Sequence, residues 1–184
     1  MQQKNTASKT ELISVGFVVS LTVHQRNLHM SKETNFSVTL RLLEGYKFEI
    51  DFGDAGKIFS DEPAPLGNGD GPKPESLLAA AIANCLAASL LFALRKYKND
   101  PGNIDAEIRG ELKRQNGRLR ITKLHVYLQL GTDTTSLPML DKALSQFENF
   151  CVVTQSVRNG IDIEVTVKNN IGEELIVDTN GFDV

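Results

Sequence analysis

The chain has 184 residues, of which 41% are hydrophobic and 23% charged, and its formal net charge is -3. This length and composition predict one compact globular domain. The slight negative charge offers no electrostatic footprint for nucleic acid or an anionic membrane, so neither is expected as a partner. The 2 cysteines and 3 histidines lack the spacing of metal ligands, and we expect no metal or other cofactor.

Residues 1–35 are predicted to form an N-terminal extension, which contains a short apolar stretch, Leu12–Val23. This stretch is too short for a membrane span and is not followed by a small-x-small cleavage site, so it does not indicate a signal peptide. We therefore expect a cytoplasmic protein. In that reducing compartment a cysteine pair is more often redox-active than structural.

Alternating apolar side chains predict a β-hairpin with its turn at Glu44–Gly45. The alternating positions are Phe36, Val38, Leu40 and Leu42 before the turn and Tyr46, Phe48, Ile50 and Phe52 after it. Residues 53–74 contain 5 glycines and 4 of the 6 prolines. Such a composition opposes regular structure and predicts an ordered loop.

An alanine-rich helix is predicted over Leu77–Leu94, with Pro74 at its start. The stretch is long enough to span a membrane. However, its alanines, together with Asn84, Cys85 and Ser89, favour a buried core helix that neighbours can approach closely.

A second hairpin is predicted over residues 104–130, with Asn116–Gly117 as its two-residue turn. The apolar phase slips between Ile121 and Leu124, which predicts a bulge near Thr122 and Lys123.

Ser136 can cap a second helix, in which apolar residues share one face at helical spacing. These residues are Leu137, Leu140, Leu144, Phe147 and Cys151. Alternation over 161–167 predicts a last strand, and residues 168–184 form a polar tail. The order ββ-α-ββ-α-β lacks βαβ alternation, so we predict an α+β fold with antiparallel sheets and a central alanine-rich helix.

The cysteines are the candidates for chemistry, although two buried, inert thiols would fit the same pattern. A thiol becomes nucleophilic where positive charge, a helix dipole or hydrogen bonds stabilise its thiolate. Arg41, Arg95 and Arg158 are the cations considered for this role.

Glu75 lies in the first turn of the predicted helix, where the helix dipole alone would favour an acidic residue. Ten residues of straight helix would place it about 15 Å from Cys85 along the axis. The two groups can meet only if the helix is broken or if a second subunit brings one to the other.

Two segments resemble the cysteine motifs of the OsmC/Ohr family. They are Pro74–Cys85 (PESLLAAAIANC) and Phe150–Val157 (FCVVTQSV), the latter followed by Gly160 and an alternating strand. The resemblance covers residues 36–167. It implies the OsmC-like fold for this domain and an intertwined homodimer with two sites at the subunit interface.

The resemblance also implies a thiol peroxidase that reduces organic hydroperoxides and is itself reduced by an external dithiol. Cys85 would then be the peroxidatic cysteine and Cys151 the resolving one. Glu75 would help to fix an activating arginine, for which Arg41 is the candidate.

Two other functions remain open at this point. One is a non-catalytic or small-ligand-binding member of the same fold, with structural cysteines. The other is a cysteine hydrolase or transferase with His125 as its base, although His125 alternates with Leu124 and Val126 on a strand face that looks exposed. Peroxide consumption separates the peroxidase from both.

Overall fold

The computed structural model describes residues 35–175. The predicted extension over residues 1–35, with its apolar stretch Leu12–Val23, falls outside the described residues except for the last position. The same holds for the end of the predicted tail, residues 176–184.

The first predicted hairpin is confirmed, and a third strand extends it into an antiparallel sheet of order β1-β2-β3. The strands are β1 (Thr39–Glu44), β2 (Lys47–Asp51) and β3 (Lys57–Ser60). The prediction that residues 53–74 lack regular structure is wrong for β3 and for the 3-10 turn η1 (Gly53–Ala55). Gly53 and Gly56 have φ values of +67° and +97°, so the glycines that argued against a strand instead reverse the chain tightly before it.

The loop that follows β3 is ordered around one buried carboxylate. Asp61 accepts backbone N–H groups from Glu62, Asn68 and Asp70 at 2.9, 3.0 and 3.1 Å. Gly67 packs so closely on Asp61 that a Cβ there would collide with the carboxylate. The carboxylate thereby fixes the loop that leads into the next helix.

Helix α1 (Pro74–Lys96) confirms the predicted alanine-rich helix and is unbroken along its 23 residues. Pro74 lies in its first turn, where a backbone N–H would have no intrahelical partner, so the N–H that proline lacks is not needed. It ends where Lys98 takes a left-handed φ of 60° and the N–H of Asn99 bonds the carbonyl of Leu94. α1 is the one helix within residues 35–175 long and apolar enough to cross a membrane, and 39% of its most apolar stretch is buried within the chain.

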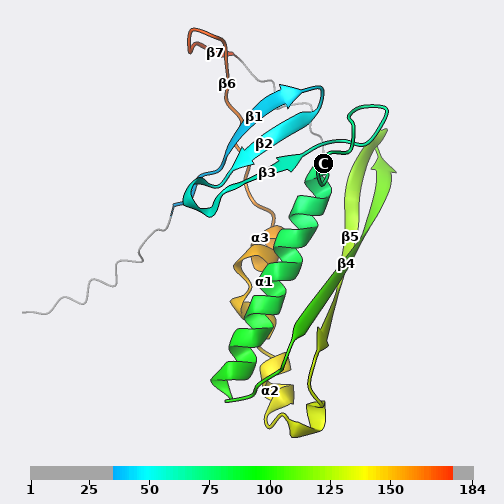
Figure 1. Ribbon diagram of the computed structural model, residues 1–184, viewed down its shortest axis with the longest axis vertical. Coiled ribbons are helices and arrows are strands. Elements are labelled where there is room, and N and C mark those ends of the chain that lie inside the picture. The colour runs from blue at the N-terminus through cyan, green and yellow to red at the C-terminus, as the bar shows by residue number, and fades with distance from the viewer. Residues whose placement is uncertain (1–34, 176–184) are drawn as a thin grey trace, which may run out of the picture. The chain divides into compact units, whose positions relative to one another are not determined.

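Strands β4 (Ile104–Gln115) and β5 (Arg118–Leu130) form the predicted second hairpin. Asn116 and Gly117 both have positive φ, as a type I′ turn requires. Glu111 pairs with Lys123 and Leu112 with Ile121, which leaves Thr122 as the extra residue of the predicted bulge. The hairpin lies along α1 (Figure 1), which contacts both of its strands.

The prediction of a single helix from Ser136 to Cys151 is wrong, because the segment contains only the end of η2 (Thr134–Ser136) and two short helices, α2 (Leu140–Leu144) and η3 (Phe147–Phe150). Helix α3 (Val152–Asn159) begins directly after it. Pro138 lacks an N–H, Met139 has a left-handed φ of 61°, and Cys151 is extended, so no continuous helix can pass through them. Ser136 therefore caps no helix, and Asp133 caps η2 through the N–H of Thr135.

The strand predicted over residues 161–167 does not form in the described part of the single chain. Only its last residue belongs to a strand, in a small hairpin of β6 (Val167–Lys168) and β7 (Glu174–Leu175) within the predicted polar tail. Ile163 is 82% exposed, since no strand among residues 35–175 pairs with the segment 161–166. Alternation alone does not provide a partner.

Two apolar clusters join α1 to the second half of the chain. The first contains Leu90, Ala93, Leu94, Leu137 and Ala143. The second contains Ile82, Leu86 and Cys151, with Cys85 packed against it. The predicted α+β class with antiparallel sheets and a central helix is confirmed, and the second cluster holds the candidate site.

Candidate active site at the two cysteines

The fold brings together two cysteines that are 66 positions apart in the sequence. Cys85 lies in the middle of α1, and Cys151 immediately precedes α3. Cys85 packs against the buried cluster that contains Cys151, and both thiols are free. Cys85 is partly exposed, whereas Cys151 is completely buried. A reagent in solution therefore reaches Cys85 first.

Cys151 is held by the first turn of α3. It was expected on the apolar face of a helix, but its backbone is extended and it occupies the N-cap position. Its Sγ accepts the backbone N–H of Thr154 at 3.4 Å and lies 3.0 Å from Thr154 Oγ1. The N–H groups of a first helical turn lack intrahelical partners, which makes them available to the sulfur.

The surroundings of the pair distinguish the two sulfurs. Burial raises the pKa of the Cys85 thiol, as does its hydrogen bond to Cys151, against the opposing effect of backbone N–H groups in α3. Burial also acts to raise the pKa of Cys151, but hydrogen bonds with Cys85, with Thr154 and with Ser89 lower it overall. Within one chain these contacts therefore favour a thiolate on Cys151 over one on Cys85.

Glu75 is remote from the cysteines within one chain. Because α1 is continuous, the ten residues between Glu75 and Cys85 span about 15 Å. Glu75 forms an ion pair with Lys73 at 2.6 Å, and this contact lowers the pKa of Glu75. The pair lines a cavity of about 220 Å³ against the β4–β5 hairpin. Of the two arrangements considered above, a broken helix is thus excluded.

Arg41 lies on β1 opposite Glu49, in the three-stranded sheet. Within residues 35–175 of one chain, no ion pair joins Arg41 to Glu75. Arg158 forms an ion pair with Glu148 at 2.5 Å, and Arg95 is exposed in the last turn of α1. The single chain thus supplies Cys85 with hydrogen bonds from α3, and the strongest influences on its pKa include no guanidinium.

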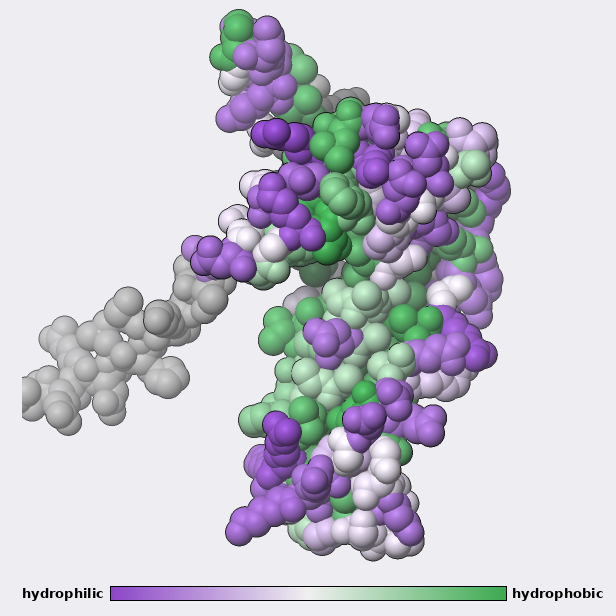
Figure 2. Space-filling model, viewed as in Figure 1, coloured by the Kyte–Doolittle hydropathy of each residue, from purple (hydrophilic) through white to green (hydrophobic). Residues whose placement is uncertain are grey.

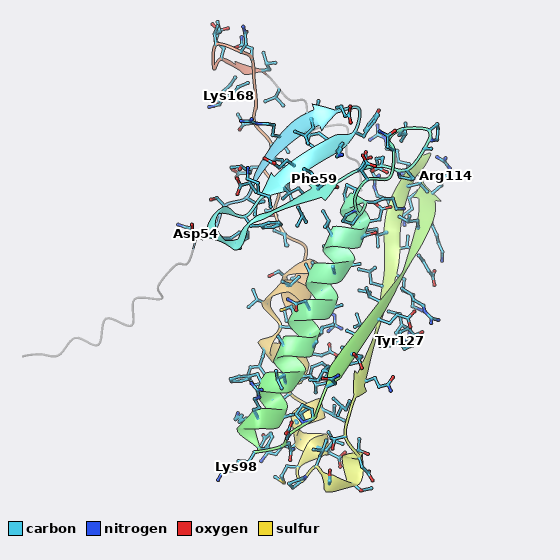
Figure 3. All side chains as sticks on the ribbon, in the orientation of Figure 1. Asp54, Phe59, Lys98, Arg114, Tyr127 and Lys168 are labelled. Atoms are coloured by element: carbon cyan, nitrogen blue, oxygen red, sulfur yellow. The ribbon has the colours of Figure 1, made fainter. Side chains whose placement is uncertain are left out.

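His125 stacks on Tyr127 with ring centroids 4.2 Å apart. Leu124 and Val126, on the other face of the strand, pack against the cysteine cluster. Tyr127 projects from the side of the hairpin turned away from α1 (Figure 3). Within the described chain this position does not place His125 as a base beside either thiol.

An apolar cavity of about 590 Å³ adjoins the cysteine cluster. Leu78, Ile82 and Leu86 line it from α1, and Thr154 and Arg158 line it from α3. A volume of this size suits a small molecule. Elsewhere, no group of three or more metal-ligating side chains occurs among residues 35–175.

Sequence reasoning missed Thr154 and did not connect Ser89 with Cys151. A usable signal was present, since a side chain that accepts hydrogen bonds at an N-cap commonly bonds the N–H three residues later. Cys151 and Thr154 have that spacing, and Ser89 follows Cys85 by one helical turn on the same face of α1.

The family model for OsmC-like proteins matches residues 67–166, which include both cysteines. Among curated proteins, the organic hydroperoxide resistance protein-like 2 of Staphylococcus epidermidis is 26% identical over 129 residues. The match covers 62% of this chain and 88% of that protein.

Solved structures support the fold. An OsmC-like protein of unknown function from Vibrio cholerae has a TM-score of 0.56 at 21% identity, with 67% of this chain and 94% of that one covered. An organic hydroperoxide resistance protein OsmC from Legionella pneumophila has a TM-score of 0.50 at 18% identity, with coverages of 71% and 95%.

Proposed function

The chain belongs to the family of OsmC-like proteins, and from this premise we propose that it is a thiol-dependent peroxidase which reduces organic hydroperoxides through Cys85 and Cys151. The family and its curated relative link the chain to hydroperoxide resistance and redox chemistry. The observation that carries the proposal is the packing of two free thiols from distant parts of the sequence in one buried cluster. Such a contact suits a cycle in which the thiols become a disulfide.

The chemistry has three steps. The Cys85 thiolate attacks one oxygen of the hydroperoxide, the O–O bond breaks, and an alcohol leaves after taking up a proton, which leaves Cys85 as a sulfenic acid. Cys151 then condenses with the sulfenic acid to form the disulfide and water. An external dithiol reduces the disulfide by thiol–disulfide exchange and restores both thiols.

The first step needs positive charge beside Cys85, because the single chain favours the proton on that sulfur. We assign this charge to Arg41 of a second copy of the chain, held by Glu75. In this assignment the site lies at a homodimer interface, and the distance from Glu75 to Cys85 along α1 is bridged between two chains.

Exposed apolar surfaces support such a dimer. Leu40 and Leu42 on β1 are 60% and 54% exposed, although they belong to the apolar face of the first hairpin. Only 39% of the most apolar stretch of α1 is buried. Figure 2 shows apolar residues along this helix at the surface. An area of this kind on a single chain marks an interface.

The apolar cavity of about 590 Å³ favours a second candidate function, that of a small-ligand-binding protein of the same fold. In that case the cysteines would be core residues and hydroperoxide would not be consumed. The cavity adjoins the cysteine cluster, so under the peroxidase proposal its apolar lining selects hydroperoxides with apolar substituents over hydrogen peroxide.

One measurement tests the proposal. The reduced protein is treated with one equivalent of cumene hydroperoxide, free thiols are counted, and the product is mapped by mass spectrometry. Loss of two thiols per chain with a Cys85–Cys151 disulfide supports the peroxidase. Cys151→Ser should consume one equivalent and stop at a sulfenic acid, and Cys85→Ser should consume none. Untouched thiols in the wild type would favour the ligand-binding function.

A further inference from the structure

Three side chains from α1 and α3 lie around the sulfur of Cys151. Cys85 and Ser89 come from adjacent turns of α1, and Thr154 comes from the first turn of α3. Ser89 and Thr154 are 6% and 7% exposed, so their hydroxyls are shielded from water. Buried hydroxyls are hydrogen-bonded as a rule, and here both contact Cys151.

The contact with Thr154 has two parts. The backbone N–H of Thr154 donates to Cys151 Sγ at 3.4 Å, and the Thr154 hydroxyl lies 3.0 Å from the same sulfur. A hydroxyl can accept a hydrogen bond from a neutral thiol and can donate one to a thiolate. The Thr154 hydroxyl can therefore remain bonded to Cys151 in both protonation states.

We propose that Thr154 is a positioning residue for disulfide closure, whose hydroxyl holds Cys151 Sγ beside Cys85 and stabilises it as the attacking thiolate. This proposal rests on the proposed function, because formation of the Cys85–Cys151 disulfide is the second step of the peroxidase cycle. It concerns the resolving step alone and needs only residues of one chain.

The reaction balances without any further reagent once a hydroperoxide has oxidised Cys85. The Cys151 thiolate attacks the sulfur of the Cys85 sulfenic acid, the S–S bond forms and the S–O bond breaks. The hydroxide that leaves takes up the proton that Cys151 released, and water is the product. Cys151 is oxidised, and the sulfur of Cys85 is reduced from the sulfenic to the disulfide state.

Closure can also be started without a hydroperoxide. Dithiobis-nitrobenzoate converts the more accessible Cys85 into a mixed disulfide and releases one coloured nitrothiolate. Attack by the Cys151 thiolate then forms the Cys85–Cys151 disulfide and expels a second nitrothiolate. The rate of the second nitrothiolate release, divided by the rate of the first, measures disulfide closure. The division corrects for any change in the accessibility of Cys85.

The variant Thr154→Val removes the hydroxyl but keeps the β-branched shape and the backbone N–H. We expect its rate ratio to fall at least tenfold, and Thr154→Ser, which restores the hydroxyl, to regain most of the loss. Thr134→Val, at an exposed position in η2, is the matched control and should behave like the wild type. Thr154→Ala removes the same hydroxyl and takes the place of the valine variant should that one not fold.

An unchanged rate ratio in Thr154→Val or Thr154→Ala would overturn the proposal, as would failure of Thr154→Ser to restore a lowered ratio. Because the probe contains no hydroperoxide, the two proposals can fail separately. If closure depends on Thr154 but the protein does not consume cumene hydroperoxide, the peroxidase proposal is refuted and the proposal for Thr154 is supported. Hydroperoxide turnover with closure independent of Thr154 would do the reverse.

Discussion

Oxidation of the thiol pair should make the protein markedly more stable. Cys85 packs against the buried cluster that contains Cys151 in the reduced protein, so a disulfide can form with little movement of the chain. The bond would join residues 66 positions apart and would restrict the unfolded chain much more than the folded one. The difference appears as a higher free energy of unfolding.

The size of the effect follows from the length of the closed loop. For a loop of this length the chain-entropy relation gives about 4 kcal/mol near room temperature. In a chain of this size each kcal/mol raises the melting temperature by roughly 2–4 °C, so the oxidised protein should melt about 8–16 °C above the reduced one.

The assay compares melting temperatures by circular dichroism at one fixed protein concentration, because association also stabilises a folded chain. One sample is kept reduced with a dithiol, and the other is oxidised and freed of oxidant. Cys85→Ser, given the same oxidant, should show no rise. A disulfide confirmed by mass spectrometry without a higher melting temperature would refute the reasoning, since it would mean that closure distorts the native packing.

Three further outcomes are expected. Glu75→Ala should lower the rate of hydroperoxide reduction at least tenfold, about 1.4 kcal/mol in the barrier, with little change in melting temperature; a normal rate with a lower melting temperature would leave Glu75 only its ion pair with Lys73. Backbone N–H groups, that of Asp70 foremost, lower the pKa of Asp61, so its carboxylate stabilises the fold above about pH 4 and loses this effect as the pH falls further. Asp61→Asn should therefore melt lower at neutral pH and show a flatter loss of stability in acid, and an acid profile identical to that of the wild type would contradict this. Leu94→Ala, at a fully buried position, should cost about 2–5 kcal/mol in urea unfolding, and a loss below about 1 kcal/mol would show that the cluster can collapse around the gap.

Local signals in the sequence were sufficient for both hairpins and for α1. Alternation with a positive-φ turn at Asn116–Gly117 defines the second hairpin from neighbouring residues alone, and the phase slip locates its bulge at Thr122. The same is true of the alanine-rich helix that begins at Pro74. These elements are determined by periodicity and turn chemistry, which depend only on residues close to each other in the sequence.

The remaining elements depend on information that a pattern does not contain. Apolar spacing across residues 136–151 resembles one helix, but the proline at 138 and the left-handed Met139 interrupt it. Alternation over 161–167 is a property of a strand, yet a strand also needs a hydrogen-bonding neighbour. Within the described residues of one chain that neighbour is missing for 161–166, and the apolar side chains stay exposed.

The candidate site divides in the same way. The contact between Cys85 and Cys151 could not be predicted from their separation of 66 residues, because it depends on the packing of α3 on α1. Thr154 could have been found, since its distance from an N-cap residue is a local rule. The placement of Arg41 and Glu75 depends on a second chain in the proposed site, so no pattern within one sequence could locate them.

These differences imply that, in the proposed dimer, the two thiols depend on different chains. The groups that favour a thiolate on Cys151 all come from α1 and α3 of the same chain. The cation that the first step requires at Cys85 is assigned to a second copy. Positive charge brought to Cys85 would stabilise a thiolate on that sulfur. Closure of the disulfide should then survive in an isolated chain, whereas attack on a hydroperoxide should require the dimer.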